Sequence, residues 1–385
     1  MGAETAIKPF KIEIAEEVLG DLRERLSRTR LAPPSPLAPW EQGTDAEALA
    51  DLLKSWQHAY DWRDHEAILN GFDQFQVPME TGQVHFIHQR STHPNARPLL
   101  IVHGWPGGVY EFYKLIPMLT QPEKFGGSAE QAFHVIAPSL PGYGFSDAPQ
   151  EPGWSPRRVA GLFHQLMTEQ LGYSDYIVQG GDWGAVVASW VAHDHSCAGL
   201  HLNMVGLRPH LDETVQLTEE ESAFLRETRR SMQQDMAYQA IQGTRPQSLG
   251  YGLQDSPAGL AGWLLEKYRA WSDCSGKWDG SISRDEILTL LTLYWVTGTI
   301  TSSMRLYYEY RKGDESLTAG QRVACPTGFA SFPGEIYRPP RSWVERAYNV
   351  VQWADMPSGG HFAALERPKE LAAELGKFKK KIENN

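Results

Sequence analysis

The stretch Gly180-Gly181-Asp182-Trp183-Gly184 constrains the fold of this chain more than any other feature. It follows the apolar run Tyr176-Ile177-Val178, which predicts a buried strand, and it precedes Ala185 to Trp190, which predicts the start of a helix. A sharp strand-to-helix turn with small residues two positions either side of one reactive side chain is a nucleophile elbow. Glycine suits such a turn because the backbone there is strained and crowded. Serine is the usual occupant, and aspartate in its place changes the chemistry open to the site.

Apolar runs alternate with helical segments on both sides of this elbow. Short apolar strands are predicted at 98–102, 133–137 and 200–205, and two more at 323–326 and 350–353. Such an alternation indicates a mainly parallel sheet with helices on both faces. Together with the elbow, it predicts an α/β-hydrolase fold with a mostly parallel central sheet.

Four segments follow from these patterns. Residues 1–95 form a polar, mostly helical N-terminal arm with one strand at Val84–His88, and residues 96–206 form the first part of the hydrolase core. Residues 207–315 are an all-helical insertion, which is typical of a lid over the carboxyl ends of the strands, and residues 316–385 complete the core. The expected helices are 15–30, 45–56 and 62–72 in the arm; one from about 110, and 155–171, in the core; 219–240, 258–270, 285–294 and 298–310 in the lid; and 363–382 at the end.

The order of the working side chains in this fold is nucleophile, acid, histidine, each in a loop after a strand. After Asp182, the loop that follows the strand at 350–353 holds Gly359-Gly360-His361, the only histidine beyond the lid. The loop after the preceding strand holds Glu335. The predicted triad is therefore Asp182, Glu335 and His361. Spacing alone leaves Asp355 open as the acid, because it also lies near His361.

An aspartate nucleophile has specific consequences. A carboxylate is ionised at neutral pH and needs no base to become nucleophilic, and the helix N-terminus favours its charge. It suits displacement at a saturated carbon, which leaves an alkyl ester on Asp182. Water deprotonated by His361, with Glu335 orienting the imidazole, would hydrolyse that ester. The backbone N–H groups of Trp183 and, by position, Trp105 are expected to form the oxyanion hole. Epoxides and alkyl halides react in this way.

Charge and cysteine usage exclude several other classes. The net charge of -11 argues against nucleic acid or an anionic membrane as partner. Three separated cysteines, an N-terminus without a signal-peptide apolar region and the lack of a membrane-length apolar run lead us to expect a soluble cytoplasmic protein. The pair His193 and His195 has no further ligand cluster near it in sequence, so we expect no metal site.

Several motifs resemble those of the microsomal-type epoxide hydrolases, which have the α/β-hydrolase fold. The resemblance covers nearly the whole chain, and its motifs are specific in combination. They are Ile7-Lys8-Pro9-Phe10, His103-Gly104-Trp105-Pro106-Gly107-Gly108, Gln179 to Gly184, Thr244-Arg245-Pro246, Trp295 to Ser303, Pro326-Thr327-Gly328-Phe329 and Gly359 to Ala364.

This resemblance implies an epoxide hydrolase that forms a vicinal diol without cofactor or metal, from an aryl or bulky epoxide. It favours Glu335 as the acid. It also implies two lid tyrosines that bind and protonate the epoxide oxygen, Tyr238 and Tyr307, with neighbouring Tyr308 an open alternative for the second. Trp105, Trp183 and the two tyrosines would contact substrate. The chain is similar to soluble bacterial members, some of which act in enediyne antibiotic biosynthesis, and relatives are often homodimers.

Two alternatives remain open from the sequence. A haloalkane or haloacid dehalogenase shares the aspartate elbow, and Trp183 and Trp105 could donate to a departing halide. The tyrosine pair argues against it, because a halide leaves as a stable anion and needs no proton. A catalytically silent binding protein of the same fold predicts a missing triad residue, whereas all three positions are filled.

Overall fold

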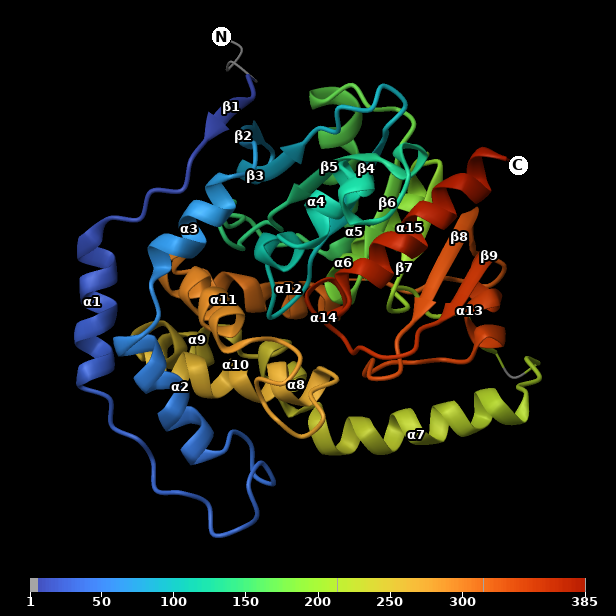
Figure 1. Cartoon of the computed structure of the whole chain (residues 1–385). Helices are drawn as coiled ribbons and strands as arrows, with labels where there is room; N and C mark the ends of the chain where they lie inside the picture. Colours follow the sequence, from blue (N-terminus) through green and yellow to red (C-terminus); the bar gives the residue numbers. More distant parts are fainter. Residues whose placement is uncertain (1–5, 213, 314, 385) are drawn as a thin grey trace.

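A nine-stranded sheet forms the centre of the computed structural model, which describes residues 6–212, 214–313 and 315–384 (Figure 1). The strand order is β1-β2-β3-β5-β4-β6-β7-β8-β9. The strands β3 to β9 carry the hydrolase core, and five of their six pairings are parallel. The strands are β1 Lys8–Phe10, β2 Gln74–Met79, β3 Gly82–Gln89, β4 Arg97–Val102, β5 Phe133–Pro138, β6 Ile177–Gly180, β7 Gly199–Leu202, β8 Val323–Ser331 and β9 Tyr348–Asp355.

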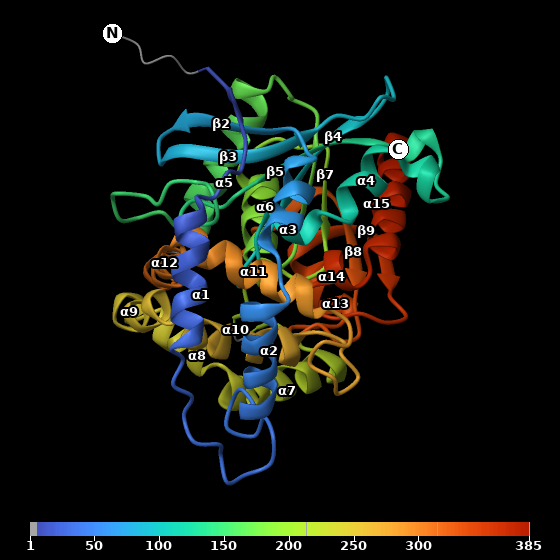
Figure 2. The same cartoon turned by 60° about the vertical axis from the view of Figure 1, so that its left-hand side comes forward.

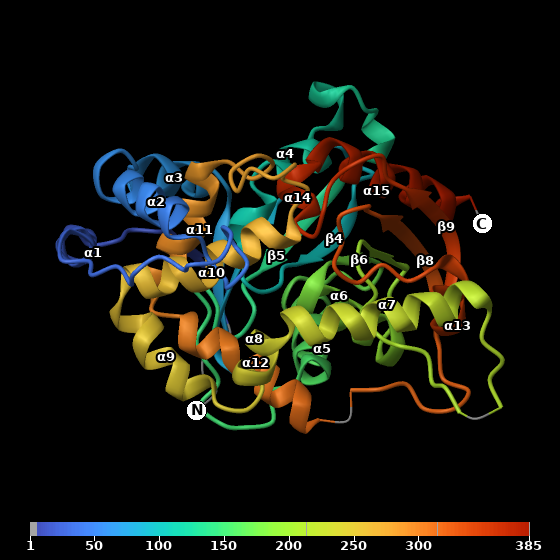
Figure 3. The same ribbon diagram turned by 90° about the horizontal axis from the view of Figure 1, so that it is seen from below.

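Helices cover both faces of this sheet (Figure 3). On one face lie α4 (Leu115–Thr120), α14 (Ala363–Glu366) and α15 (Pro368–Glu383); on the other lie α5 (Pro156–Gln165), α6 (Asp182–Asp194) and α13 (Arg341–Ala347). The side chains of strand β4 show why both faces of the sheet need to be covered. Leu99 and Ile101 belong to one buried apolar cluster and Leu100 and Val102 to another, because successive side chains point to opposite faces.

Six helices are inserted between β7 and β8, and they lie together beside the sheet (Figures 1 and 2). The arm helices α1, α2 and α3 lie against this group, with α2 in contact with α10 and α11. The inserted helices are α7 Glu219–Asp235, α8 Ala237–Gln242, α9 Pro246–Asp255, α10 Pro257–Trp271, α11 Arg284–Thr297 and α12 Ile300–Lys312, and the arm helices are α1 Glu16–Ser27, α2 Ala46–His58 and α3 Trp62–Asn70.

The arm contains more strand than its composition predicts. It supplies β1, β2 and β3, which extend the sheet by antiparallel pairing, whereas the sequence predicted one strand there. In β2, Phe75, Val77 and Met79 do alternate with polar residues, but Pro78 argues against a strand. Pro78 is tolerated because it lies one residue from the turn that leads into β3.

Three predicted helices also differ in extent. The helix expected at 219–240 is broken at Met236, so that α8 begins at Ala237, and the one expected at 363–382 is broken before Pro368, which occupies the first turn of α15. The helix expected from about residue 110 is a 3₁₀ turn, η1 (Val109–Phe112), followed by α4. The helix α9 was not predicted.

Candidate active site

Asp182 stands at the turn between β6 and α6, at the carboxyl edge of the sheet. Its φ is +49°, in the left-handed region that side chains rarely adopt. The two flanking glycines are required by crowding, because a Cβ on Gly180 would collide with the backbone of Gly184 and a Cβ on Gly184 would collide with the Val102 carbonyl. The strained turn therefore presents the Asp182 carboxylate at the N-terminus of α6, where the helix dipole favours its charge.

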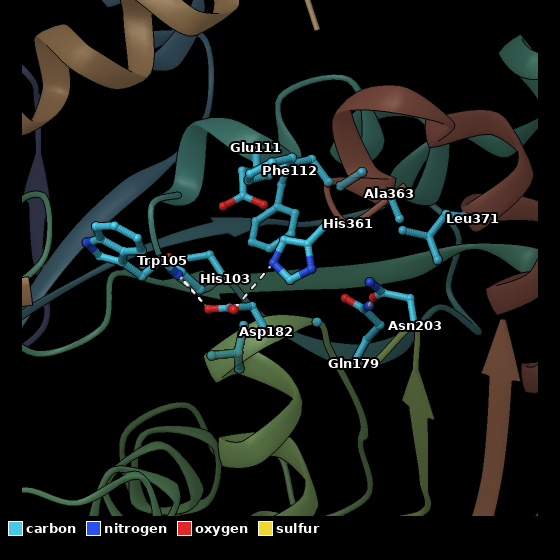
Figure 4. A pocket seen from close by; sticks show the side chains of 15 residues that line it. His103, Trp105, Glu111, Phe112, Gln179, Asp182, Asn203, His361, Ala363 and Leu371 are labelled. Atoms are coloured by element: carbon cyan, nitrogen blue, oxygen red, sulfur yellow. Dashed lines mark hydrogen bonds and ion pairs between the residues drawn. The ribbon is translucent and has the colours of Figure 1, made fainter. Parts of the chain in front are cut away.

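Two loops from neighbouring strands bring the other triad members to this carboxylate. Nε2 of His361, in the loop after β9, lies 3.3 Å from Oδ2 of Asp182 (Figure 4). Nδ1 of His361 lies 2.8 Å from Oε1 of Glu335, which follows β8. Glu335 is held in turn by the backbone N–H of Ile336 at 2.7 Å. The structure thus joins the three predicted side chains in one chain of contacts.

Asp355, the alternative acid, takes another direction. Its side chain is 68% exposed and pairs with Arg338 at 3.7 Å, whereas the side chain of Glu335 is 2% exposed. Asp355 ends β9 and extends the strand towards solvent, six residues before His361. The geometry therefore gives the acid position to Glu335.

The charge of His361 depends on the two carboxylates that flank it. Burial lowers the pKa of the imidazole, but Glu335 and Asp182 together overcome this and hold it well above the ordinary value. In the free site the two carboxylates therefore favour the imidazolium form of His361. Removal of either negative charge would shift the imidazole towards the neutral form that can act as a base.

Backbone donors surround the other oxygen of Asp182. The Trp105 N–H donates to Oδ1 at 2.7 Å. The first intrahelical bond of α6 runs from Ala185 N–H to the Gly181 carbonyl, so the N–H of Trp183 is left free of the helix ladder and directed towards its N-terminus. Both predicted oxyanion-hole residues therefore lie beside the carboxylate, with the contact to Trp105 already formed.

Aromatic rings form the wall opposite Asp182. Tyr238 stacks on Trp105 with centroids 5.6 Å apart, and Tyr307 meets Trp183 edge-on at 4.6 Å. The two tyrosine rings are 5.9 Å apart and both are buried. Burial raises the pKa of both hydroxyls above the ordinary value, so both carry their protons at neutral pH. Tyr308 points elsewhere, with the Lys312 ammonium 5.5 Å from its ring centre.

A cavity of about 280 Å³ opens above Asp182. Trp183, Tyr238, Tyr307 and Trp271 line the part near the carboxylate, and α7 closes the outer side with the polar residues Thr228, Ser231 and Asp235. The remaining lining residues are Val186, Met204, Val205, Gly206, Arg208, Met236, Gln239, Ala270, Tyr310, Ile336 and Tyr337. The break in α7 at Met236 is what directs both Met236 and Tyr238 into this space.

Sequence reasoning missed two residues at the site. The Trp271 carbonyl accepts the His361 N–H at 2.8 Å, and its ring lies 5.2 Å from the imidazole. Glu111 lines a small second cavity beside Asp182 and His361. The spacing Gly108-x-x-Glu111 of a helix cap was the one signal for Glu111 in the sequence, whereas nothing near Trp271 in the sequence points to the site.

The described residues show no other centre of this kind. His193 pairs with Asp194 at 2.7 Å, and His195 stacks on His164. Among residues 6–212, 214–313 and 315–384, no three His, Cys, Asp or Glu side chains are grouped as metal ligands. Across the same described residues no single helix is long and apolar enough to cross a membrane, and α11 with α12 meets that test only as a pair bent by 91°.

Comparison with known proteins places this geometry in a family. A family model described as "Epoxide hydrolase N terminus" matches residues 7–112, and one described as "alpha/beta hydrolase fold" matches residues 97–285. Epoxide hydrolase 1 of Oryctolagus cuniculus is 39% identical over 404 residues, which cover 97% of this chain and 88% of the rabbit protein. This chain belongs to the epoxide hydrolase family.

Solved structures of epoxide hydrolases are similar over the whole length. The Aspergillus niger epoxide hydrolase is 32% identical with a TM-score of 0.86, covering 98% of this chain and 97% of its own. The juvenile hormone epoxide hydrolase of the silkworm Bombyx mori is 33% identical with a TM-score of 0.87, covering 99% and 96%. The predicted fold and the predicted resemblance to epoxide hydrolases are therefore confirmed, and the enzyme is a hydrolase.

Proposed function

We propose that this epoxide hydrolase opens its substrate by attack of Asp182 Oδ2 on one epoxide carbon. The observation that supports this is that the two carboxylate oxygens of Asp182 have different surroundings. Oδ1 is held by the Trp105 N–H, while Oδ2 faces His361 and the cavity walled by Tyr238 and Tyr307. In this step an Oδ2–C bond forms, the epoxide C–O bond breaks, and the resulting alkoxide takes a proton from a tyrosine hydroxyl.

Hydrolysis of the ester completes the proposed cycle. His361 takes a proton from a water molecule, and the hydroxide adds to Cγ of Asp182. The negative charge develops on Oδ1, where the N–H groups of Trp105 and Trp183 lie. The Cγ–Oδ2 bond then breaks, His361 returns the proton to the departing oxygen, and the vicinal diol leaves with an oxygen that came from the enzyme. The carboxylic acid left at Asp182 gives up its proton and the tyrosinate left by ring opening takes one up, so that both groups return to their starting forms.

The cavity favours an aryl or bulky epoxide as substrate. Its volume of about 280 Å³ and its aromatic walls suit a flat apolar group, and the helices α7–α12 that close it would act as a lid that excludes water. The alternative dehalogenase reaction has one supporting observation. The buried indole N–H groups of Trp105 and Trp183 form no well-aligned hydrogen bond among the described residues, although Trp183 interacts with the side chain of Tyr307.

A single turnover in oxygen-18 water tests the mechanism. With enzyme in excess over styrene oxide, the first diol should carry no label, because both of its oxygens come from the epoxide and from Asp182. Label should appear in the diol only in later turnovers, after the carboxylate has exchanged. A fully labelled diol in the first turnover refutes the ester mechanism, and chloride release from 1-chlorobutane faster than diol formation would favour the dehalogenase.

A further inference from the structure

A second, small cavity lies behind the triad, separate from the substrate cavity. Its volume of about 20 Å³ suits one water molecule. Trp105, Glu111, Asp182 and His361 all line it, so it reaches both the nucleophile and the base (Figure 4). A water molecule there would lie next to the atoms that ester hydrolysis must join.

Glu111 is built into this cavity by the loop that precedes it. One carboxyl oxygen, Oε1, accepts the Gly108 N–H at 3.0 Å. Position 107 requires glycine, because a Cβ there would collide with that same oxygen. The hydroxyls of Tyr268 and Tyr294 donate to the carbonyls of Pro106 and Gly107 at 2.5 and 2.9 Å, which fixes the loop from the inserted helices.

The second carboxyl oxygen, Oε2, has no hydrogen-bond partner among the described residues. Figure 4 shows the carboxyl group of Glu111 directed towards the space between Trp105 and His361, above Asp182. Glu111 is half-buried, and Oε2 is not among the enclosed side-chain atoms that lack a partner, so water can reach it. The cavity that Glu111 lines can hold a water molecule that donates to this oxygen.

We infer that Glu111 seats the hydrolytic water: Oε2 accepts one O–H of the water molecule, whose other O–H is directed at Nε2 of His361. The inference rests on the ester mechanism proposed above and adds a residue to it. Glu111 neither gains nor loses a proton in this step. The water proton goes to His361, and the new bond forms between the water oxygen and Cγ of Asp182.

The protonation state of Glu111 sets the pH range of this role. Burial raises the pKa of Glu111 to about 8, against the opposing effects of the hydrogen bond from Gly108 and the charge of His361. Oε2 accepts a hydrogen bond in the carboxylate form, so the role of Glu111 should be fullest above about pH 8.

The variant Glu111→Gln keeps the hydrogen bond from the Gly108 N–H but removes the proposed acceptor for water. Its amide oxygen can still accept the Gly108 N–H, but the cavity then receives an NH₂ group, which donates to the water oxygen instead of accepting from it. Stopped-flow tryptophan fluorescence, which Trp105 and Trp183 should make sensitive to ester formation, gives the rate of ring opening. We expect that rate to stay within about threefold of wild type, and ester hydrolysis to fall by at least about tenfold.

Intact-protein mass spectrometry provides the second readout. During steady-state turnover of styrene oxide, the mass of the alkyl ester should dominate in Glu111→Gln and be minor in wild type, while Glu111→Asp, which keeps an acceptor on a shorter arm, should lie between them. Equal hydrolysis rates in wild type and Glu111→Gln overturn the inference, as does an equal loss of both steps with a lowered Tm. His361→Gln serves as the reference: if no ester accumulates even there, the ester mechanism itself fails.

Discussion

Replacing Tyr307 by phenylalanine removes one hydroxyl from the wall opposite Asp182 and leaves the ring. The ring of Tyr307 is held by edge contacts with Trp183, at 4.6 Å, and with Trp105, at 5.7 Å. Phenylalanine makes the same contacts, so the fold and the cavity shape should persist. What is lost is a donor to the oxygen that becomes negatively charged as the epoxide opens.

The size of the effect follows from that single contact. A hydrogen bond to a charged group contributes about 1.5–3 kcal/mol, which corresponds to roughly a 10- to 150-fold slower ring opening. Because Tyr238 lies only 5.9 Å away, centroid to centroid, it retains a donor at the same oxygen, so Tyr307→Phe should slow the reaction without abolishing it. Loss of both hydroxyls should cost more than either alone.

Single-turnover stopped-flow fluorescence with styrene oxide measures ring opening directly, and ester hydrolysis in the same trace should change little. The matched control is Tyr308→Phe, on the same helix but away from the cavity, which should match wild type. A Tyr307→Phe rate within about twofold of wild type, or a loss in Tyr308→Phe instead, would refute the assignment.

Three further outcomes follow from the same structure. Asp182→Asn should lower the pKa of His361, because it removes a carboxylate that raises it, and nitrogen-15 NMR of the imidazole measures this; an unchanged pKa would contradict the contact. Glu335→Gln should slow ester hydrolysis by roughly 10³-fold while the ester still forms, as mass spectrometry would show; unaffected hydrolysis would remove Glu335 from the triad. Lys379→Met removes the donor from three backbone carbonyls, of which that of Ala132 is buried, and should lower the free energy of unfolding by about 1–3 kcal/mol in urea titration. Lys380→Met, at a half-exposed side chain, should change it by at most about 1 kcal/mol.

The elbow could be predicted from the sequence because its constraint is local. A strand, two glycines and a helix start are contiguous, and backbone crowding at Gly180 and Gly184 requires that spacing. His361 could be predicted from chain order alone. The choice between Glu335 and Asp355 could not, because it depends on where β8 and β9 end: β8 continues to Ser331 and carries the following loop to the imidazole.

The residues that were missed are those whose positions depend on tertiary contacts. Trp271 lies at the end of α10, about 90 residues from His361 in sequence, and reaches it only because the inserted helices pack over the sheet edge. The helix break at Met236 was also missed, because the local sequence pattern of residues 219–240 favours one continuous helix. The strands β1 and β2 were missed because they form by antiparallel pairing at the edge of the sheet. The local sequence does not indicate which strand each of them pairs with.

The electrostatics of the site link its two proposed steps in a fixed order. With Asp182 ionised, the two flanking carboxylates raise the pKa of His361 and favour the imidazolium, which is the form that cannot accept a proton from water. In the proposed first step, attack on the epoxide would remove the charge of Asp182, one of the two groups that raise the pKa of His361, and would bring the imidazole closer to the neutral base. Formation of the ester would thus favour the form of His361 that takes a proton from water.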